Sequence, residues 1–408
     1  LAKKLKLTTH DMVEVKGADR SFKIAVNVQP GLHPQAAAIA VGYGRTAAGK
    51  VGNGVGVNVY PWVSMDQGRA VFAGMPIQIT KTGARYKIAE TQWHHSSENR
   101  PIINDLTLSE YRANPGTSNH TDPHLRLDKV PSMWPEFEYK GYKWGMAIDL
   151  STCTGCGACI VACQAENNIP TVGRDNVRIS REMHWMRIDR YYSGSEEQPN
   201  VVFQPMICQH CDNAPCETVC PVLATVHNDE GMNVQVYNRC VGTRYCMNNC
   251  PYKTRRFNFF DHWKSYEGTQ NLVWNPDVTV RSRGIMEKCT FCVQRVREAK
   301  DRAKDVGSKV RDGDLKTACQ QTCPTEAIVF GDVNNAESRV SKLQKDARAF
   351  RVLEVLNTKP AVSYLTKVRN QESKGHGHGN GHDEAGHGAS QSHGKAPAST
   401  ATQSKGNA

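Results

Sequence analysis

The sequence predicts an α+β protein in which a small β-barrel precedes a cysteine-rich domain made of two similar halves. Three observations lead to this prediction. All 15 cysteines lie between Cys153 and Cys323. Within that stretch, a strand, a cysteine-rich loop and a helix recur. Before it, short β-branched runs alternate with glycine-rich turns, a pattern typical of small all-β domains.

The N-terminal segment, residues 1–84, is expected to form the β-barrel. Its densely spaced glycines between positions 42 and 56 permit positive φ and close backbone approach. The apolar or β-branched runs expected to form strands are 12–15, 22–28, 36–41 and 71–80. Residues 85–139 lack periodic pattern and are expected to be an extended linker. In this linker His94 and His95 are candidate ligands or proton carriers, with a surface or packing role as the alternative that we favour.

The cysteine-rich domain is expected to span residues 140–332. Its predicted elements are strands at 144–149, 201–207 and 327–330, a hairpin at 224–237, and helices at 157–168 and 292–304. Their order predicts an internal repeat, with residues 258–284 as an insertion.

Two segments follow this domain. Residues 333–371 are expected to be a helical extension, with a helix over 335–354 that contacts another subunit. Residues 372–408 are rich in Gly, Ser, Ala and His, and we expect a disordered tail. The alternative for this tail is metal capture by its histidines, which stand at positions 376, 378, 382, 387 and 393.

The spacing of the cysteines indicates iron–sulfur chemistry. The first run, C-T-G-C-G-A-C-I-V-A-C at 153–163, has three thiols separated by two residues and a fourth after three more. Ferredoxins hold cubane iron–sulfur clusters with this spacing, and the fourth cysteine ligates the other cluster of a pair. The sequence therefore predicts a tandem ferredoxin-like domain that passes single electrons and has no catalytic residues of its own.

Two other uses of cysteine fit less well. An odd number of cysteines in C-x-x-C steps is unsuited to a disulfide framework. Zinc ribbons use two C-x-x-C pairs, whereas three or four cysteines crowd into each run here, so a zinc scaffold is a weaker alternative. The later runs are Cys208, Cys211, Cys216 and Cys220; Cys240, Cys246 and Cys250; and Cys289, Cys292, Cys319 and Cys323.

The third run is one cysteine short. By the spacing of the first run a cysteine belongs at position 243, where Thr243 stands. A threonine hydroxyl is a poor iron ligand compared with a soft, readily ionised thiolate. We therefore predict three 4Fe-4S clusters and one 3Fe-4S cluster, with a cubane that uses an oxygen or water ligand as the alternative.

Charge and hydropathy restrict the function further. The net charge of +11 fits a solvated basic surface, with contact to an anionic membrane or an acidic partner as the alternative. No arginine-rich arm or stacking-aromatic motif indicates nucleic-acid binding, and no apolar run reaches membrane-spanning length. Because the chain begins at Leu1 without a signal peptide, we expect a processed product or the C-terminal piece of a longer protein.

The N-terminal segment resembles the last domain of molybdopterin oxidoreductases, a barrel that closes over the pterin dinucleotide. The resemblance rests on V-G-Y-G-R at 41–45 and G-V-N-V-Y-P-W at 56–62. It implies a pterin-binding role, but we expect a retained barrel without molybdopterin because the domains that ligate molybdenum are missing. The residues that would contact the pterin are Gly42, Gly44, Arg45 and Asn58.

The cysteine-rich domain resembles the four-cluster subunits of the same family. A barrel directly ahead of it, with T-Q-W-H-H at 91–95, N-R-P-I-I at 99–103 and L-S-E-Y at 108–111, resembles the iron–sulfur subunit of bacterial alternative complex III. The family pattern pairs the first run with the fourth and the second with the third. It implies 4Fe-4S clusters on Cys153, Cys156, Cys159 and Cys323; on Cys289, Cys292, Cys319 and Cys163; and on Cys208, Cys211, Cys216 and Cys250; and a 3Fe-4S cluster on Cys240, Cys246 and Cys220.

This resemblance implies the electron-transfer subunit of a respiratory quinol:electron-acceptor oxidoreductase. Its expected partners are a polytopic quinol-binding membrane subunit, multihaem and monohaem cytochrome c subunits, and an upstream molybdopterin-like portion of the same protein. The expected location is the periplasmic face of the bacterial inner membrane, as a peripheral part of a membrane complex. The alternative is the electron-transfer part of a working molybdopterin reductase of the polysulfide or tetrathionate type.

Overall fold

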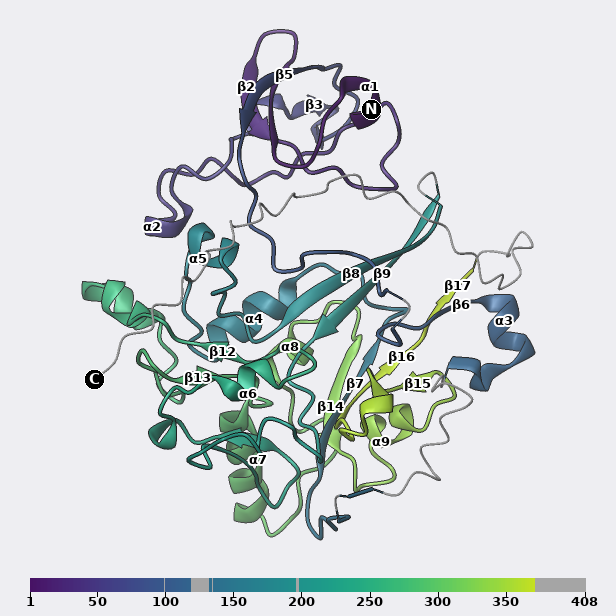
Figure 1. Ribbon diagram of the computed structural model, residues 1–408, viewed down its shortest axis with the longest axis vertical. Helices are drawn as coiled ribbons and strands as arrows, with labels where there is room; N and C mark the ends of the chain where they lie inside the picture. The colour runs from purple at the N-terminus through teal and green to yellow at the C-terminus, as the bar shows by residue number, and fades with distance from the viewer. Residues whose placement is uncertain (99, 119–131, 134, 196–197, 371–408) are drawn as a thin grey trace, which may run out of the picture. The chain divides into compact units, whose positions relative to one another are not determined.

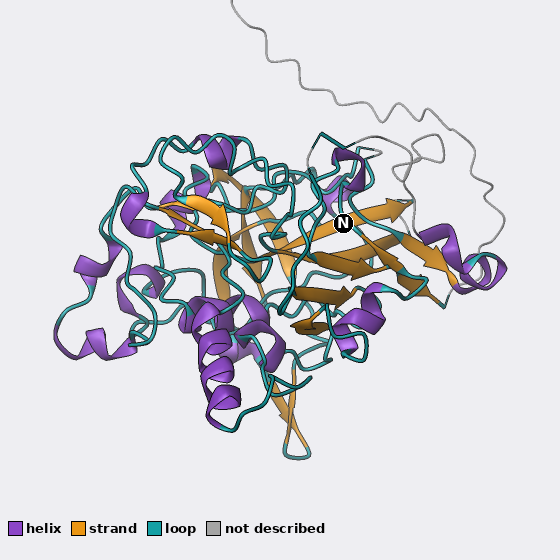
Figure 2. Ribbon diagram, turned by 90° about the horizontal axis from the view of Figure 1, so that it is seen from below, coloured by secondary structure: helices purple, strands orange, loops and turns teal. Residues whose placement is uncertain are grey.

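The computed structural model describes residues 1–98, 100–118, 132–133, 135–195 and 198–370 (Figure 1). The predicted tail of residues 372–408, with its five histidines, lies outside this described part. Figure 2 shows that loops connect mostly short helices and strands. None of the helices in the described part combines the length and apolar character of a membrane span.

The N-terminal segment contains one small antiparallel sheet and a separate hairpin. The sheet has the order β2-β1-β5, and Val13 and Val15 of β1 are buried because alternate side chains of a strand share a face. The elements are α1 (Ala2–Leu5), β1 (Asp11–Lys16), β2 (Ser21–Ala25), α2 (Gly49–Gly52), η1 (Tyr60–Trp62), β3 (Ser64–Asp66), β4 (Arg69–Val71) and β5 (Gln78–Arg85).

The sheet and the hairpin do not join through strand pairing in the described residues, so a closed barrel is not confirmed. The run 36–41, expected to be a strand, is a loop in which Ile39 and Val41 are exposed. Among the described residues no strand pairs with it, so hydrophobicity alone did not produce a strand there.

The cysteine-rich domain is built on a four-stranded sheet with the order β14-β7-β16-β15. β7 (Trp144–Asp149) pairs antiparallel with β14 (Ile328–Asp332) and parallel with β16 (Val362–Leu365). β7 is buried almost throughout, as expected for a central strand covered on both faces. The rings of Trp144 and Phe330 stack at 5.6 Å between centroids and join the two ends of the cysteine-rich stretch.

The segment after residue 332 differs from the expected helix over 335–354. The one α-helix described in this segment is α9 (Arg339–Gln344), and it packs against β14. The chain then continues through β15 (Ala349–Phe350), η6 (Glu354–Leu356), β16 and β17 (Lys367–Arg369). The apolar residues of β16 are fully buried beside β7, and this burial makes the segment a strand of the central sheet.

The linker also joins the main structure. β6 (Asp105–Thr107) pairs in parallel with β17, and α3 (Leu108–Ala113) follows with a capping box between Thr107 and Glu110. The remaining elements are η2 (Pro115–Ser118), α4 (Ala158–Glu166), α5 (Arg174–Arg178), β8 (Arg187–Gly194), β9 (Pro199–Met206), β10 (Thr225–His227), β11 (Asn233–Gln235), η3 (Tyr237–Arg239), α6 (Tyr245–Asn248), β12 (Arg256–Phe257), η4 (His262–Ser265), η5 (Gly268–Val273), β13 (Met286–Glu287), α7 (Val293–Asp305) and α8 (Ala318–Gln321).

Candidate iron–sulfur centres

The fifteen thiols gather in four sites, each assembled from two different cysteine runs. Burial raises the pKa of Cys159 to about 12, and the neighbouring thiols of its own site add to this effect. Burial likewise raises the pKa of Cys163, Cys211 and Cys246, each of which has the sulfurs of its site beside it. The first site contains Cys153, Cys156, Cys159 and Cys323; the second Cys163, Cys289, Cys292 and Cys319; the third Cys208, Cys211, Cys216 and Cys250; and the fourth Cys220, Cys240 and Cys246.

Glycine lets the loops of the first and fourth sites turn back on themselves. Gly155 has φ 70° and Gly242 has φ 77° at the same step of their loops. A Cβ on Gly155 would lie 2.6 Å from the Phe203 ring, and one on Gly242 would lie 2.7 Å from the Gly284 carbonyl oxygen. Only glycine satisfies both the positive φ and the close approach.

The two loops remain equivalent through the next two residues. Gly157 and Arg244 both adopt left-handed φ, 79° and 64°, and directly precede α4 and α6. Cys156 and Thr243 stand at the same step between these features, and both are exposed. Thr243 therefore lies at the position in its loop that Cys156, the second thiol of the first run, occupies in the first site.

Backbone N–H groups point at the sulfurs. The Ala224 N–H donates to Cys220 Sγ at 3.2 Å, and the Ala327 N–H donates to Cys323 Sγ at 3.3 Å. Burial raises the pKa of both thiols, but several such backbone donors, preceded for Cys323 by the Thr325 side chain, outweigh it and lower the pKa overall. Hydrogen bonds to sulfur stabilise the thiolate form, which is the form that binds iron.

The sites follow one another in a definite order. Cys319 of the second site has Cys159 of the first among its neighbours, and Cys289 of the second has Cys208 of the third. Arg255 lies among the sulfurs of both the third and the fourth sites. The order is therefore first, second, third and fourth. Cysteines of the first and fourth sites are the most accessible, with Cys156 exposed.

The donor sets fit multi-iron clusters by number, softness and spacing. Among the described residues, no three His, Cys, Asp or Glu side chains converge closely enough to hold a single metal ion. The four cysteines of the third site line one small cavity, together with Asn233 and Arg255.

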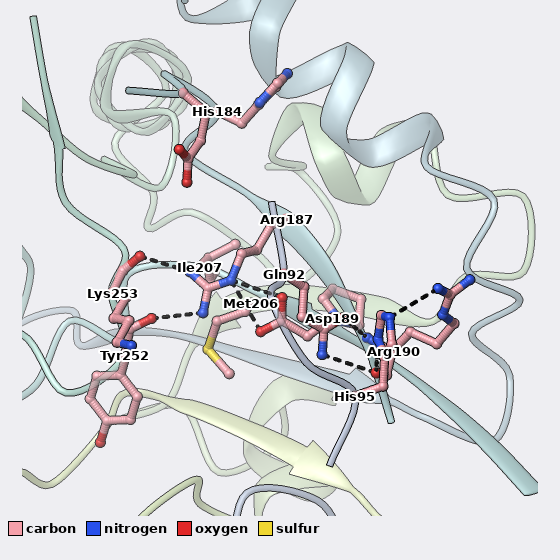
Figure 3. A network of polar contacts seen from close by, with 12 residues as sticks. Gln92, His95, His184, Arg187, Asp189, Arg190, Met206, Ile207, Tyr252 and Lys253 are labelled. Atoms are coloured by element: carbon pink, nitrogen blue, oxygen red, sulfur yellow. Dashed lines mark hydrogen bonds and ion pairs between the residues drawn. The ribbon is translucent and has the colours of Figure 1, made fainter. Parts of the chain in front are cut away.

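Arg187 of β8 holds the backbone segment that follows the third cysteine run (Figure 3). Arg187 Nε donates to Asp189 at 2.8 Å, and its two terminal nitrogens donate to the carbonyl oxygens of Tyr252 and Lys253 at 2.9 and 2.7 Å. The Arg187–Asp189 pair is almost fully buried, so this contact fixes the backbone just after Cys250.

The linker histidines have local partners. His95 Nδ1 lies 3.1 Å from the Arg190 carbonyl oxygen, and its Nε2 lies 3.3 Å from Arg190 Nη2 (Figure 3). Both ring nitrogens are engaged, which favours the packing role. His94 is exposed, and its Nδ1 lies 3.0 Å from the Ser96 carbonyl oxygen.

The candidate pterin residues contact one another. Arg45 Nε donates to the Gly42 carbonyl oxygen at 2.9 Å. A Cβ on Gly44 would lie 2.3 Å from the Asn58 backbone nitrogen, so glycine is required by the chain's own packing.

Sequence reasoning missed two buried cations beside the sites. Arg255 is 1% exposed and Lys288 is 0% exposed. Lys288 Nζ donates to the carbonyl oxygens of Asn233 and Cys289. No motif in the cysteine spacing indicates either side chain, although both stand within five residues of a cysteine run.

Comparison with known proteins supports an iron–sulfur assignment. Two family models described as a 4Fe-4S dicluster domain match residues 152–224 and 199–265. The iron–sulfur cluster-binding subunit of menaquinone reductase from Nitratidesulfovibrio vulgaris is 48% identical over 242 residues, which cover 58% of this chain and 92% of the relative.

Two further relatives show similar coverage. The Hdr-like menaquinol oxidoreductase iron–sulfur subunit 1 of Archaeoglobus fulgidus is 33% identical over 56% of this chain and 86% of its own length. A tetrathionate reductase subunit of Salmonella typhimurium is 34% identical over 55% of this chain and 72% of its own length.

Proposed function

The chain belongs to the family of iron–sulfur electron-transfer subunits of molybdopterin-type membrane oxidoreductases, and we propose that it relays electrons from a quinol through four clusters. The proposed cluster ligands are the thiols of the four sites, with 4Fe-4S clusters at the first, second and third and a 3Fe-4S cluster at the fourth. When bound, the clusters supply one-electron chemistry, while the chain holds them in line and sets their surroundings.

One observation carries this proposal: the thiols form four sites that follow one another, with the exposed Cys156 in the first and the partly exposed Cys220 and Cys240 in the fourth. Electrons can therefore enter at the fourth site and leave at the first, with the second and third sites between them. A zinc scaffold or a disulfide framework would not require such an order.

The fourth site is the proposed entry point for electrons. Thr243 occupies its missing ligand position, which favours a three-iron cluster. Exposed apolar side chains surround it or lie in the 258–284 segment, which suits contact with a membrane subunit that binds the quinol. They are Leu223, Val241, Tyr245, Phe260, Trp263, Leu272 and Val273.

The finer proposal is alternative complex III. The linker motifs and the preceding β-rich segment support it, and with it a periplasm-facing peripheral location in a membrane complex. The proposed electron takers are multihaem and monohaem cytochrome c subunits at the exposed first site. Residues 1–84 are proposed to be a retained molybdopterin-like domain that carries no cofactor.

A second candidate function has its own support. The relative from Salmonella is a subunit of tetrathionate reductase. This favours the alternative in which the chain serves a working molybdopterin reductase, and the same thiol relay would then feed a catalytic subunit.

Metal analysis of the full-length protein in its complex separates the two. We expect iron with no molybdenum or tungsten, and reduction of the clusters by a quinol analogue. Stoichiometric molybdenum would support the reductase, and iron-free protein containing zinc would refute both proposals.

A further inference from the structure

Of the three arginines buried in the described part of the chain, two are paired with a carboxylate. Arg281 lies 2.9 Å from Glu287, and Arg256 lies 2.7 Å from Glu182. Burying a charge is costly unless an opposite charge compensates it. Arg255 follows a different pattern, because no carboxylate among the described residues forms an ion pair with it.

The partners of Arg255 are neutral groups and thiols. Its Nη1 donates to Cys216 Sγ at 3.3 Å and to Asn233 Oδ1 at 3.4 Å. Its Nη2 donates to Thr225 Oγ1 and Gln235 Oε1, and its Nε has no hydrogen-bond partner in the described part of the chain. The guanidinium is therefore held in place by uncharged side chains and directed at a sulfur ligand of the third site.

Arg255 also acts on the fourth site. Cys246 of that site is among the thiols that face its guanidinium, together with Cys216, Cys208 and Cys250 of the third site. One fixed cation thus faces the sulfurs of two successive sites.

We propose that Arg255 is the shared counter-cation of the third and fourth clusters and raises the reduction potential of both. Each cluster gains one negative charge when it accepts one electron, with no bond formed and no proton required. A guanidinium that stays charged and buried stabilises this reduced state more than the oxidised state. The inference rests on the proposed function, since it requires clusters at both sites.

The positive charge of Arg255 affects electron flow through the third cluster. The third cluster connects the fourth to the rest of the series. If its potential fell well below that of the fourth, electrons would be retained at the entry point. Arg255 acts through the ligand sulfurs, so it is a positioning residue and not a catalytic one.

Redox titration followed by electron paramagnetic resonance tests the inference in the intact complex. In Arg255→Met the reduced-to-oxidised ratio of the third cluster at a fixed ambient potential should fall about tenfold, or about 59 mV for a one-electron couple. The fourth cluster should shift in the same direction, and the first should not move. Arg255→Lys, which keeps the charge, should restore most of the shift.

A second variant keeps the guanidinium in place. Gln235→Glu has nearly the same shape and puts a carboxylate against Arg255 Nη2, so it should lower the same two potentials. The matched control is the double variant Glu166→Gln/Arg295→Gln, which removes an ion pair beside the second site with no change in net charge and should shift neither potential.

The outcomes are distinct. Variants with full iron content and unchanged third and fourth potentials would overturn the role of Arg255 and leave the relay intact. Equal shifts in all four clusters would also overturn it, because they would indicate a general structural effect. Wild-type protein without iron would instead refute the proposed function.

Discussion

Replacement of Thr243 by cysteine should convert the fourth site from a three-iron to a four-iron centre. The loop is already shaped for this change. Gly242 and Arg244 have φ 77° and 64°, and the corresponding residues on either side of Cys156 have φ 70° and 79°. Because Thr243 is exposed, the smaller thiol meets no packing constraint there. The variant needs only to supply the missing soft ligand.

The size of the expected change determines which assay can detect it. Conversion adds one iron to a total of about fifteen per chain, a change too small for iron analysis alone. The signal of the oxidised three-iron cluster, in contrast, should fall from about one spin per chain to less than about a tenth of that value. Electron paramagnetic resonance of the oxidised protein therefore separates the two outcomes.

Thr243→Ser is the matched control. It keeps a hydroxyl at the same position, so the three-iron signal should persist at full intensity. If Thr243→Cys retains that signal while its other clusters are intact, Thr243 does not occupy the missing ligand position. If the wild-type protein shows no three-iron signal, the fourth site holds a cubane with an oxygen ligand.

Three other perturbations test the surroundings of the sites. Glu287→Gln leaves the charge of Arg281 buried and unpaired, so it should lower the free energy of chemical unfolding by about 3–5 kcal/mol. A double variant in which Arg281 is also replaced by an uncharged residue should recover most of this loss. Gly155 has φ 70°, and Gly155→Ala would place a Cβ against the Phe203 ring of β9. Electron paramagnetic resonance of this variant should therefore show loss of the first cluster alone. Arg295 lowers the pKa of Glu166 from its ordinary value of 4.5. The ionised Glu166 therefore stabilises the folded protein above pH 4.5, and this stabilisation is lost as the pH falls through the lowered pKa. The difference in thermal midpoint between wild type and Glu166→Gln should accordingly vanish in acid.

The cysteine-rich domain was largely predictable because its local signals agree with its tertiary structure. The predicted strand at 144–149 is β7, and the predicted helices at 157–168 and 292–304 correspond to α4 and α7. Each helix directly follows a cysteine loop that ends in a left-handed residue, so loop and helix specify each other.

The C-terminal segment was not predictable in this way. Residues 335–354 have helical composition, but only α9 is helical, and the decisive event is the insertion of β16 next to β7. Long-range pairing of this kind leaves no local trace, since an apolar run such as 361–365 suits either a strand or a buried helix. The run 36–41 shows the converse, because it is apolar but found no partner.

The candidate sites show the same division. The spacing alone indicated which cysteines act as ligands and marked Thr243 as the missing-ligand position, and both assignments stay predictions. The N–H donors and the buried cation Arg255 come from segments whose approach depends on the fold. Their positions could be found only once β10, β11 and the third run were placed together.

The central claim is that these thiols hold a series of iron–sulfur clusters. The most direct measurement is iron and sulfide content with electron paramagnetic resonance on anaerobically purified protein. The account predicts about fifteen irons per chain, one three-iron signal when oxidised, and signals from coupled 4Fe-4S clusters when reduced. Colourless protein with zinc or with free thiols in place of iron would contradict it.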